Sequence, residues 1–289
     1  MRTAASLMVL LLLPAQAALA QLPAPRGLAV DRDVAVRVYN PSGDTRITGW
    51  DQDSVAAVAA PATGALVFVG SRGAVKLGLD SIAAAAGGTP LEVRVPAGAR
   101  VWVQGGSGTV EATGVTGELD LHTIEGHIRV EGAPARLTAE AVDGDIDVEG
   151  HAATTYVRTA GGTITLRYLR GECTATTVSG PIRIGGADLL RGRLETISGE
   201  ISFKGRIEHG GVVEAESHSG LIELRLPPDI SADFDLTSYR SSVESELGPT
   251  SAAARHRHFS LNGGSALIVA RTFKGAVRVV KQPLPETLP

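Results

Sequence analysis

The strongest constraint on the fold is a glycine that recurs at a fixed spacing through the middle of the chain. Five glycines follow one another at intervals of 18 residues, and two more continue the series after 19 and then 21 residues. They are Gly108, Gly126, Gly144, Gly162, Gly180, Gly199 and Gly220. A fixed period of this length indicates a repeat architecture, in which each unit packs only against its neighbours.

Apolar residues stand at fixed distances after each repeat glycine. The residue four positions after it is apolar, and the residues between are mostly polar. The residue two positions after it is always β-branched: Val110, Ile128, Ile146, Ile164, Ile182, Ile201 and Ile222. Alternation with a period of two predicts a short strand. A further glycine six positions on, in five of the seven units, predicts a tight turn with positive φ.

A second strand is expected before each repeat glycine, because an apolar residue also stands five positions before it. Two strands per repeat indicate a coil whose successive turns stack and bury their apolar columns against each other. We therefore predict an all-β fold, a single parallel β-solenoid with rungs of about 18 residues, capped by irregular β-strands at both ends.

The repeat divides the chain into five segments. Residues 1–20 form a signal peptide, residues 21–100 an N-terminal β cap with the first strands, and residues 101–228 the regular 18-residue repeats. Residues 229–281 are expected to form C-terminal β rungs and a cap, and residues 282–289 a frayed tail.

The first twenty residues have the pattern of a secretory signal. Arg2 precedes an apolar run from Leu7 to Leu13, and the triplet Ala18-Leu19-Ala20 provides a cleavage site before Gln21. We expect export to the periplasm or the cell surface, and no transmembrane helix after cleavage, because no later apolar run is long enough. The only cysteine, Cys173, replaces apolar residues of an inward column and is expected to be a buried, inert thiol.

Short motifs within the repeats resemble a known family. The pattern Thr-x-Ser-Gly-x-Ile occurs at Thr177–Ile182 and Thr196–Ile201, Val93-Arg94-Val95-Pro96 precedes the repeats, and Thr272–Val277 closes them. From about Val34 to Val280 the chain resembles the bacterial putative-adhesin family of β-strand-repeat domains of unknown function. The resemblance implies an exported β-solenoid of the bacterial cell envelope and brings no catalytic residues with it.

Charge and composition argue against nucleic acid as a partner. The formal net charge is −4, and aromatic residues make up only 4% of the chain, so neither a basic surface nor stacking platforms are expected. We predict a non-catalytic structural or binding module without a cofactor, whose partner is an envelope protein or a charged polysaccharide. Two alternatives remain open: a self-assembling envelope scaffold, and a polysaccharide-acting β-helix enzyme. The enzyme is disfavoured because the tight spacing leaves no room for loops that would build a groove.

Two outward columns form the candidate binding face. Three positions after the repeat glycine, Glu111, Arg129 and Asp147 alternate in charge, and Arg183 follows two turns later. Five positions after the glycine, acidic residues give way to basic ones along the stack. The residues proposed for the face are Glu131, Asp147, Glu149, Arg167, Arg183, Lys204 and Arg225. Such a polarised face could bind a charged polymer or another copy of the chain.

Metal sites are not predicted, although three groups of residues were considered. Asp145, Asp147 and Glu149 share an outward face but do not match a calcium loop, so a solvated face is expected there. The pair His256/His258 has no third ligand nearby in the sequence, and His209 and His218 lie near Glu214 and Glu216 but in unequal registers. The remaining histidines, His122, His127 and His151, are expected at outward or turn positions without partners.

Overall fold

The protein is built from β-strands alone over the residues that the structure describes. The computed structural model describes residues 26–59, 66–79, 88–249 and 254–282, and within these ranges it has 24 strands and no helix. The all-β class predicted from the sequence is therefore confirmed. In the same ranges no helix has the length and apolarity to span a membrane. The predicted signal peptide and residues 283–289 of the predicted tail lie outside the described residues.

The strands form two long runs that share β17 and β18. In the first run, neighbours pair in the order β5 (Leu66–Gly70), β6 (Ala74–Leu79), β2 (Ala35–Ser42), β8 (Arg100–Ser107), β10 (Glu118–Glu125), β12 (Arg136–Asp143), β14 (Thr154–Arg158), β16 (Arg170–Thr177), β17 (Ile182–Thr196), β18 (Ile201–Ser217), β23 (Ala266–Thr272), β20 (Ala232–Ser238) and β22 (His256–Leu261).

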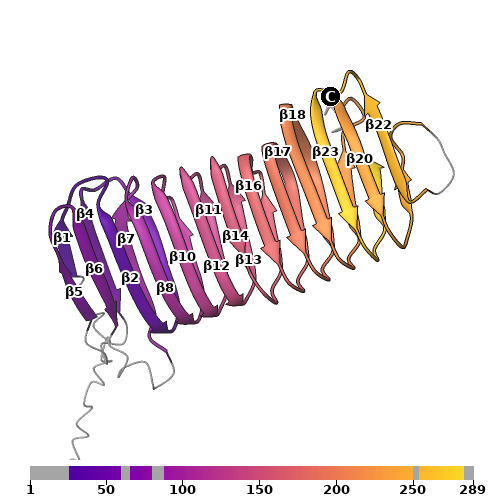
Figure 1. Cartoon of the computed structure of the whole chain (residues 1–289). Helices are drawn as coiled ribbons and strands as arrows, with labels where there is room; N and C mark the ends of the chain where they lie inside the picture. Colours follow the sequence, from indigo (N-terminus) through magenta and orange to yellow (C-terminus); the bar gives the residue numbers. More distant parts are fainter. Residues whose placement is uncertain (1–25, 60–65, 80–87, 250–253, 283–289) are drawn as a thin grey trace, which may run out of the picture.

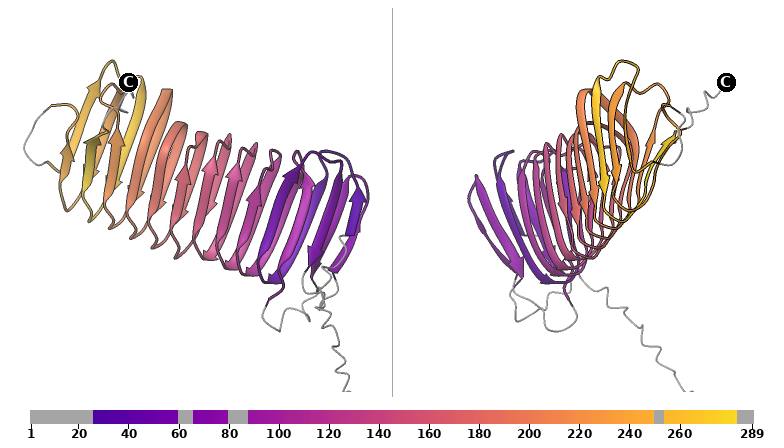
Figure 2. Two further views of the ribbon diagram at one scale, coloured as in Figure 1. Left: turned by 180° about the vertical axis from the view of Figure 1, so that it is seen from behind. Right: turned by 45° about the vertical axis from the view of Figure 1, so that its right-hand side comes forward.

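In the second run the order is β1 (Arg26–Ala29), β4 (Ser54–Ala59), β7 (Leu91–Pro96), β3 (Thr45–Trp50), β9 (Val110–Thr113), β11 (Ile128–Gly132), β13 (Ile146–Gly150), β15 (Ile164–Arg167), β17, β18, β19 (Ile222–Leu226), β24 (Val277–Lys281) and β21 (Val243–Ser245). Figure 1 shows the strands side by side along the molecule, and Figure 2 shows the same stack from behind and obliquely.

In the middle of the molecule the chain pairs with itself 18 residues further on. Ile128 aligns with Ile146, Ile146 with Ile164, and Ile164 with Ile182, all in parallel register. These isoleucines are fully buried. Stacking places each side chain on its equivalent in the next turn, and burying one such side chain stabilises the fold by about 1.5–3 kcal/mol. The inward columns predicted from the sequence are thus the core.

The repeat glycines are required because successive turns approach each other closely. A Cβ atom added to Gly180 would overlap the carbonyl oxygen of Gly162 one turn earlier, and the same overlap occurs at Gly126, Gly144, Gly162, Gly199, Gly220 and Gly275. Among the repeat glycines only Gly108 has positive φ, and most of the other positive-φ glycines lie elsewhere in the turns, such as Gly132 and Gly150 six positions after a repeat glycine. At these repeat-glycine positions there is therefore no room for any side chain.

A buried hydroxyl stabilises most of these corners. The residue three positions before the repeat glycine is a buried Thr or Ser in most turns. Its oxygen accepts the amide of the residue three positions on, as from Gly180 to Thr177 Oγ1 (3.2 Å) and from Gly275 to Thr272 Oγ1 (3.1 Å). The same Thr272 hydroxyl donates to the carbonyl oxygen of Gly220 in the neighbouring turn (3.3 Å). One side chain thus closes a turn and joins it to the next.

The N-terminal end does not follow sequence order. β2 and β3 pair with β8 and β9 on one side and with β6 and β7 on the other, so residues 35–50 lie between two later segments. Figure 1 shows this as the indigo β2 lying beside the magenta β8. The outermost strands at this end are β5 and β1.

The C-terminal end has the same arrangement. β23 and β24 pair with β18 and β19 on one side and with β20 and β21 on the other. The yellow β23 therefore lies between β18 and β20 in Figure 1. The last described residues of the chain fill an inner turn, and β20, β21 and β22 lie outside them.

Strand orientation is mixed, which corrects the prediction of a purely parallel stack. Among the described strands, the pairs β5–β6, β1–β4, β4–β7 and β20–β22 are antiparallel, and all lie at the two ends. The end strands, expected to be irregular, are regular antiparallel partners. Folding back on the last turn satisfies backbone groups that a parallel stack would leave open at its ends.

Candidate binding face

All seven residues of the predicted face lie on the second run of strands. Glu131, Glu149, Arg167, Lys204 and Arg225 form one row across β11, β13, β15, β18 and β19, interrupted at β17 by Gly185. We call this the graded row, because its acidic residues lie toward the N-terminal end and its basic residues toward the C-terminal end.

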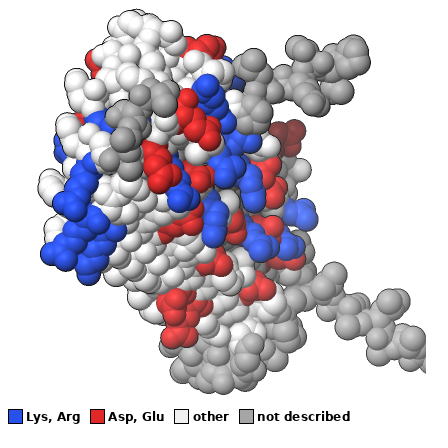
Figure 3. Space-filling view, turned by 90° about the vertical axis from the view of Figure 1, so that its right-hand side faces the viewer, with Lys and Arg blue, Asp and Glu red and all other residues white. Residues whose placement is uncertain are grey.

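Asp147 and Arg183 belong to a neighbouring row, the charge row, which runs further than the repeat suggested. In stacking order it consists of Glu92, Arg46, Glu111, Arg129, Asp147, Thr165, Arg183, Ser202, Glu223, Arg278 and Glu244. No two neighbours in this row carry the same charge. Figure 3 shows basic and acidic side chains interleaved on one flank of the molecule.

Several charges of the two rows are paired. In the charge row, Arg46 Nη2 lies 2.9 Å from Glu111 Oε2, and Arg278 Nε lies 3.3 Å from Glu244 Oε2. The hydrogen bond that Arg46 donates to Glu111, together with the negative charge of that carboxylate, raises the pKa of Arg46 above its ordinary value. Exposed pairs of this kind stabilise a fold by about 0–1 kcal/mol each, so the row favours one register more than it adds stability.

The basic half of the face combines paired and unpaired cations. Arg225 Nε lies 2.7 Å from Glu223 Oε1, and Arg167 Nη1 lies 3.7 Å from Glu149 Oε2. Within the described ranges, no ion pair joins Arg183 or Lys204 to an acidic side chain. Their charges are available to a ligand.

Sequence reasoning missed the residues that extend the charge row at both ends. A shallow groove of about 300 Å³ at the N-terminal end of the row is lined by Arg46, Glu92, Glu111 and Arg129. Of these, Glu111 and Arg129 were expected in the row, whereas Arg46 and Glu92 come from β3 and β7, which the irregular N-terminal sequence did not place. At the other end Arg278 could have been found, because it lies three positions after Gly275, as Arg129 lies three positions after Gly126.

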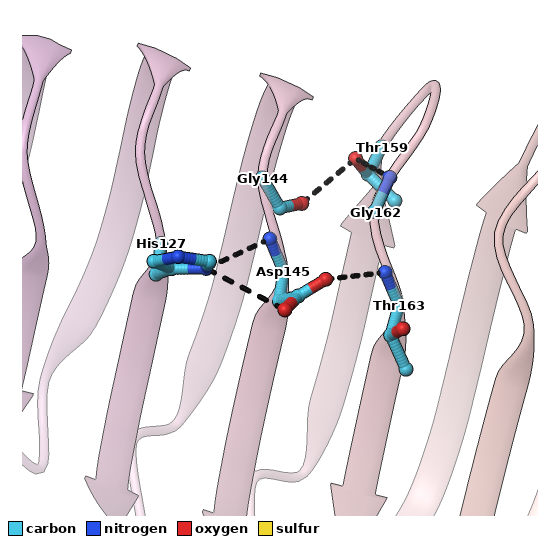
Figure 4. A network of polar contacts seen from close by, with 6 residues as sticks. All are labelled: His127, Gly144, Asp145, Thr159, Gly162 and Thr163. Carbon is cyan, nitrogen blue, oxygen red and sulfur yellow. Dashed lines mark hydrogen bonds and ion pairs between the residues drawn. The ribbon is translucent and has the colours of Figure 1, made fainter.

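The carboxylate considered for calcium is engaged with backbone instead. Asp145 Oδ1 accepts the amide of Thr163 (2.7 Å), and the amide of Asp145 donates to His127 Nδ1 (3.2 Å), as Figure 4 shows. The described residues hold no group of three or more side chains placed to bind a metal ion. Asp145 therefore joins three successive turns.

The histidines expected to lack partners have them, which corrects that prediction. His127 accepts the Asp145 amide, His122 Nε2 lies 2.7 Å from Asp120 Oδ1, and His151 Nδ1 contacts the carbonyl oxygen of Tyr168 (2.5 Å). Asp120 lies two residues from His122 on the same strand, β10, whereas the partners of His127 and His151 lie one turn further along the stack.

The two histidine pairs considered as zinc ligands, His256/His258 and His209/His218, also contact other residues. His256 Nδ1 lies 2.9 Å from Thr237 Oγ1 on β20, and His258 aligns with Asp235 on the same strand. His218 stacks on Phe273, with ring centroids 5.1 Å apart, whereas His209 lies within β18. Neither pair is assembled as a metal site in the described part of the chain.

Comparison with known proteins gives distant neighbours only. No protein-family profile matches the chain, and no curated protein matches it. A crystal structure of a putative cell adhesion protein from Clostridium sporogenes aligns with 8% identity and a TM-score of 0.25, covering 90% of this chain and 99% of that one. A putative adhesin from Bacteroides fragilis aligns with 11% identity and a TM-score of 0.36, covering 89% and 96%.

The names of both neighbours refer to adhesion, as does the name of the family that the repeat motifs resemble.

Proposed function

We propose that the chain is an adhesin-like, non-catalytic β-solenoid module of the bacterial cell envelope, which binds an anionic polysaccharide through the basic half of its graded and charge rows. Export through residues 1–20 would place it in the periplasm or at the cell surface. Parallel stacking through the middle of the molecule supports the solenoid interpretation.

The observation that carries the proposal is a cation on each of four neighbouring strands, which lie about 4.8 Å apart. Arg167, Lys204 and Arg225 lie in the graded row on β15, β18 and β19, and Arg183 lies in the charge row on β17. A polymer with a negative charge on each repeating unit can contact several of these groups at once. Each contact is weak, but contacts along one chain add through their high effective concentration.

The test is binding to polygalacturonate, a polysaccharide with one carboxylate per sugar, compared with neutral dextran. We expect residues 21–289 to bind polygalacturonate more weakly as salt is added, because exposed charges are screened over about 8 Å at physiological ionic strength. Reversing three cations, Arg167→Glu, Lys204→Glu and Arg225→Glu, should lower the affinity at least tenfold in titration calorimetry.

The control makes the same charge change on the other run of strands. Arg136, Arg158 and Arg170 are exposed on β12, β14 and β16, so reversing these three changes the net charge equally without altering the proposed face. Equal losses in both triple variants would mean that net charge alone attracts the polymer, and the proposed face would be rejected. Unchanged binding by the first variant would reject it as well.

A further inference from the structure

An exposed apolar ridge follows one corner of the stack, where strands of the first run lead into the repeat glycines. It is formed by the residue two positions before the glycine, or its equivalent, in eight successive turns. In stacking order these residues are Ile124, Val142, Ala160, Val178, Ile197, His218, Phe273 and Tyr239. The Ile, Val, Phe and Tyr side chains among them are 36–60% exposed.

Backbone hydrogen bonds between corners hold the ridge together. The amide of Ala160 donates to the carbonyl oxygen of Val142, that of Val178 to Ala160, and that of Ile197 to Val178, each at 3.2 Å. The turns that carry these residues lie in a row along the lower edge of the molecule in Figure 1. A continuous apolar strip of this kind is unusual on a free surface and indicates an interaction site.

Aromatic side chains broaden the ridge at its C-terminal end. The rings of His218 and Phe273 stack, and the ring of Tyr239 lies 6.1 Å from that of Phe273. With Val178 and Ile197 they line a groove of about 500 Å³. This end of the ridge can accept apolar side chains that project from another surface.

The residue that directly follows each ridge residue in the sequence gives the ridge a charge gradient, from acidic at one end to basic at the other. In the same stacking order these neighbours are Glu125, Asp143, Gly161, Ser179, Ser198, Ser219, Lys274 and Arg240. The two acidic and two basic residues are exposed, and among the described side chains none of the four forms an ion pair. The Arg240 guanidinium lies 5.0 Å from the Phe273 ring, so its charge is held beside the ridge.

Because one end of the ridge is acidic and the other basic, the ridge is complementary in charge to a second copy of itself that runs in the opposite direction. If a second copy packs on the ridge with its long axis inverted, a two-fold axis passes between the fourth and fifth turns. Glu125 then faces Arg240 of the partner subunit, and Asp143 faces Lys274 of the partner subunit, with small residues at the centre. Parallel packing would instead oppose acid to acid and base to base.

The same two-fold rotation also brings the apolar side chains of the two ridges together. Val178 meets the partner's Ile197 at the centre, and the small side chains of Val142 and Ile124 meet the larger rings of the partner's Phe273 and Tyr239. Eight turns at about 4.8 Å give a ridge of about 34 Å. We propose that the apolar ridge is the interface of an antiparallel, two-fold symmetric dimer of this chain.

The test is the oligomeric state of residues 21–289 by sedimentation equilibrium. We expect a dimer for the natural sequence, and a monomer when Lys274→Glu and Arg240→Glu make both ends of the ridge acidic. Adding Glu125→Lys and Asp143→Lys to that variant reverses the whole gradient and should restore the dimer. All four residues are exposed, so thermal unfolding should be unchanged in each variant.

The apolar contact is tested separately with a matched control. Ile197→Ser removes two ridge contacts per dimer and should raise the dissociation constant on the order of a hundredfold. Leu267→Ser changes an exposed leucine of β23 outside the ridge and should leave it unchanged. A monomer for the natural sequence at all concentrations, or a dimer that survives charge reversal, would overturn the proposal.

The dimer does not depend on the proposed function. Its residues lie at the corner of the stack, whereas the polysaccharide face lies on the second run of strands. A protein that binds polygalacturonate but stays monomeric would reject the dimer alone, and a dimer that ignores the polymer would reject the binding face alone.

Discussion

At the scale of single residues, the repeat glycines lie where the carbonyl oxygen of the preceding turn leaves no room for a Cβ atom. Glycine is often required because it tolerates positive φ, and among the repeat glycines that reason applies to Gly108 alone. The 18-residue period was visible in the sequence. The close approach of one turn to the next was not, because it depends on how the turns stack.

Substituting one repeat glycine should therefore destabilise the protein strongly. Gly180→Ala forces a methyl group against the carbonyl oxygen of Gly162, and we expect a loss of about 2–3 kcal/mol in the free energy of unfolding. Gly185→Ala is the control, because a Cβ there meets no atom within 4 Å. Urea unfolding measures both. Equal stability of the two variants would contradict the crowded column.

The single cysteine of the chain, Cys173, has a thiol that is held in its protonated form by burial. Cys173 is buried as predicted, and burial raises the pKa of its thiol from 9.0 to about 12. The folded protein therefore keeps the proton at a pH where the unfolded chain has lost it.

This difference predicts a stability loss at high pH. The contribution of the neutral thiol is unaffected below pH 9 and falls by about 1.4 kcal/mol for each pH unit between 9 and 12. Urea unfolding of the natural protein and of Cys173→Val at pH 8 and pH 10.5 isolates the effect. We expect the natural protein to lose about 2 kcal/mol more than the variant. Equal losses of unfolding free energy in the natural protein and in Cys173→Val would show that burial does not raise the pKa of the thiol.

At the scale of strands and turns, the buried hydroxyl column explains the Thr-x-x-Gly spacing of the repeats. Each hydroxyl accepts an amide within its own turn, and several also donate to the turn beside it. The sequence displayed the motif and the strands on either side of it. The hydrogen bond from one turn to the next could not be seen in the sequence, because it depends on the register in which the turns stack.

Removing one of these hydroxyls should cost the energy of a buried hydrogen-bonding group. Thr272→Val leaves the Gly275 amide and the Gly220 carbonyl oxygen unpaired, and we expect a loss of about 1–3 kcal/mol. Thr174→Val, on an outward position of β16, should change stability by less than about 0.5 kcal/mol. Thermal unfolding of both variants decides whether the hydroxyl or only the β-branched shape matters at position 272.

At the scale of the whole molecule, both ends place an early or late segment inside the stack. Residues 35–50 lie between β6–β7 and β8–β9, and residues 266–281 lie between β18–β19 and β20–β21. Antiparallel strands then close each end. The terminal segments are thereby integral to the core.

Truncation should consequently expose strand edges and yield no shorter soluble stack. A chain ending at residue 227 lacks β23 and β24 and leaves β18 and β19 unpaired along that side. We expect residues 21–227 to aggregate in light scattering, because unpaired edges pair with other chains. Removal of residues 283–289 alone should leave the protein soluble. A monodisperse 21–227 fragment would contradict this account.

The amino-acid sequence alone determined the period, the inward columns, the charged rows between Glu111 and Arg225, and the two strands of each turn as far as β16, whereas β17 and β18 each run through both strand positions without a break. These features are local, or repeat at a constant spacing, so alternation and register reveal them. The tertiary structure decided the rest. It placed Arg46 beside Glu111, Arg278 beside Glu223, and Phe273 between His218 and Tyr239. Those contacts join segments whose order in space differs from their order in the chain, so the 18-residue period does not give them.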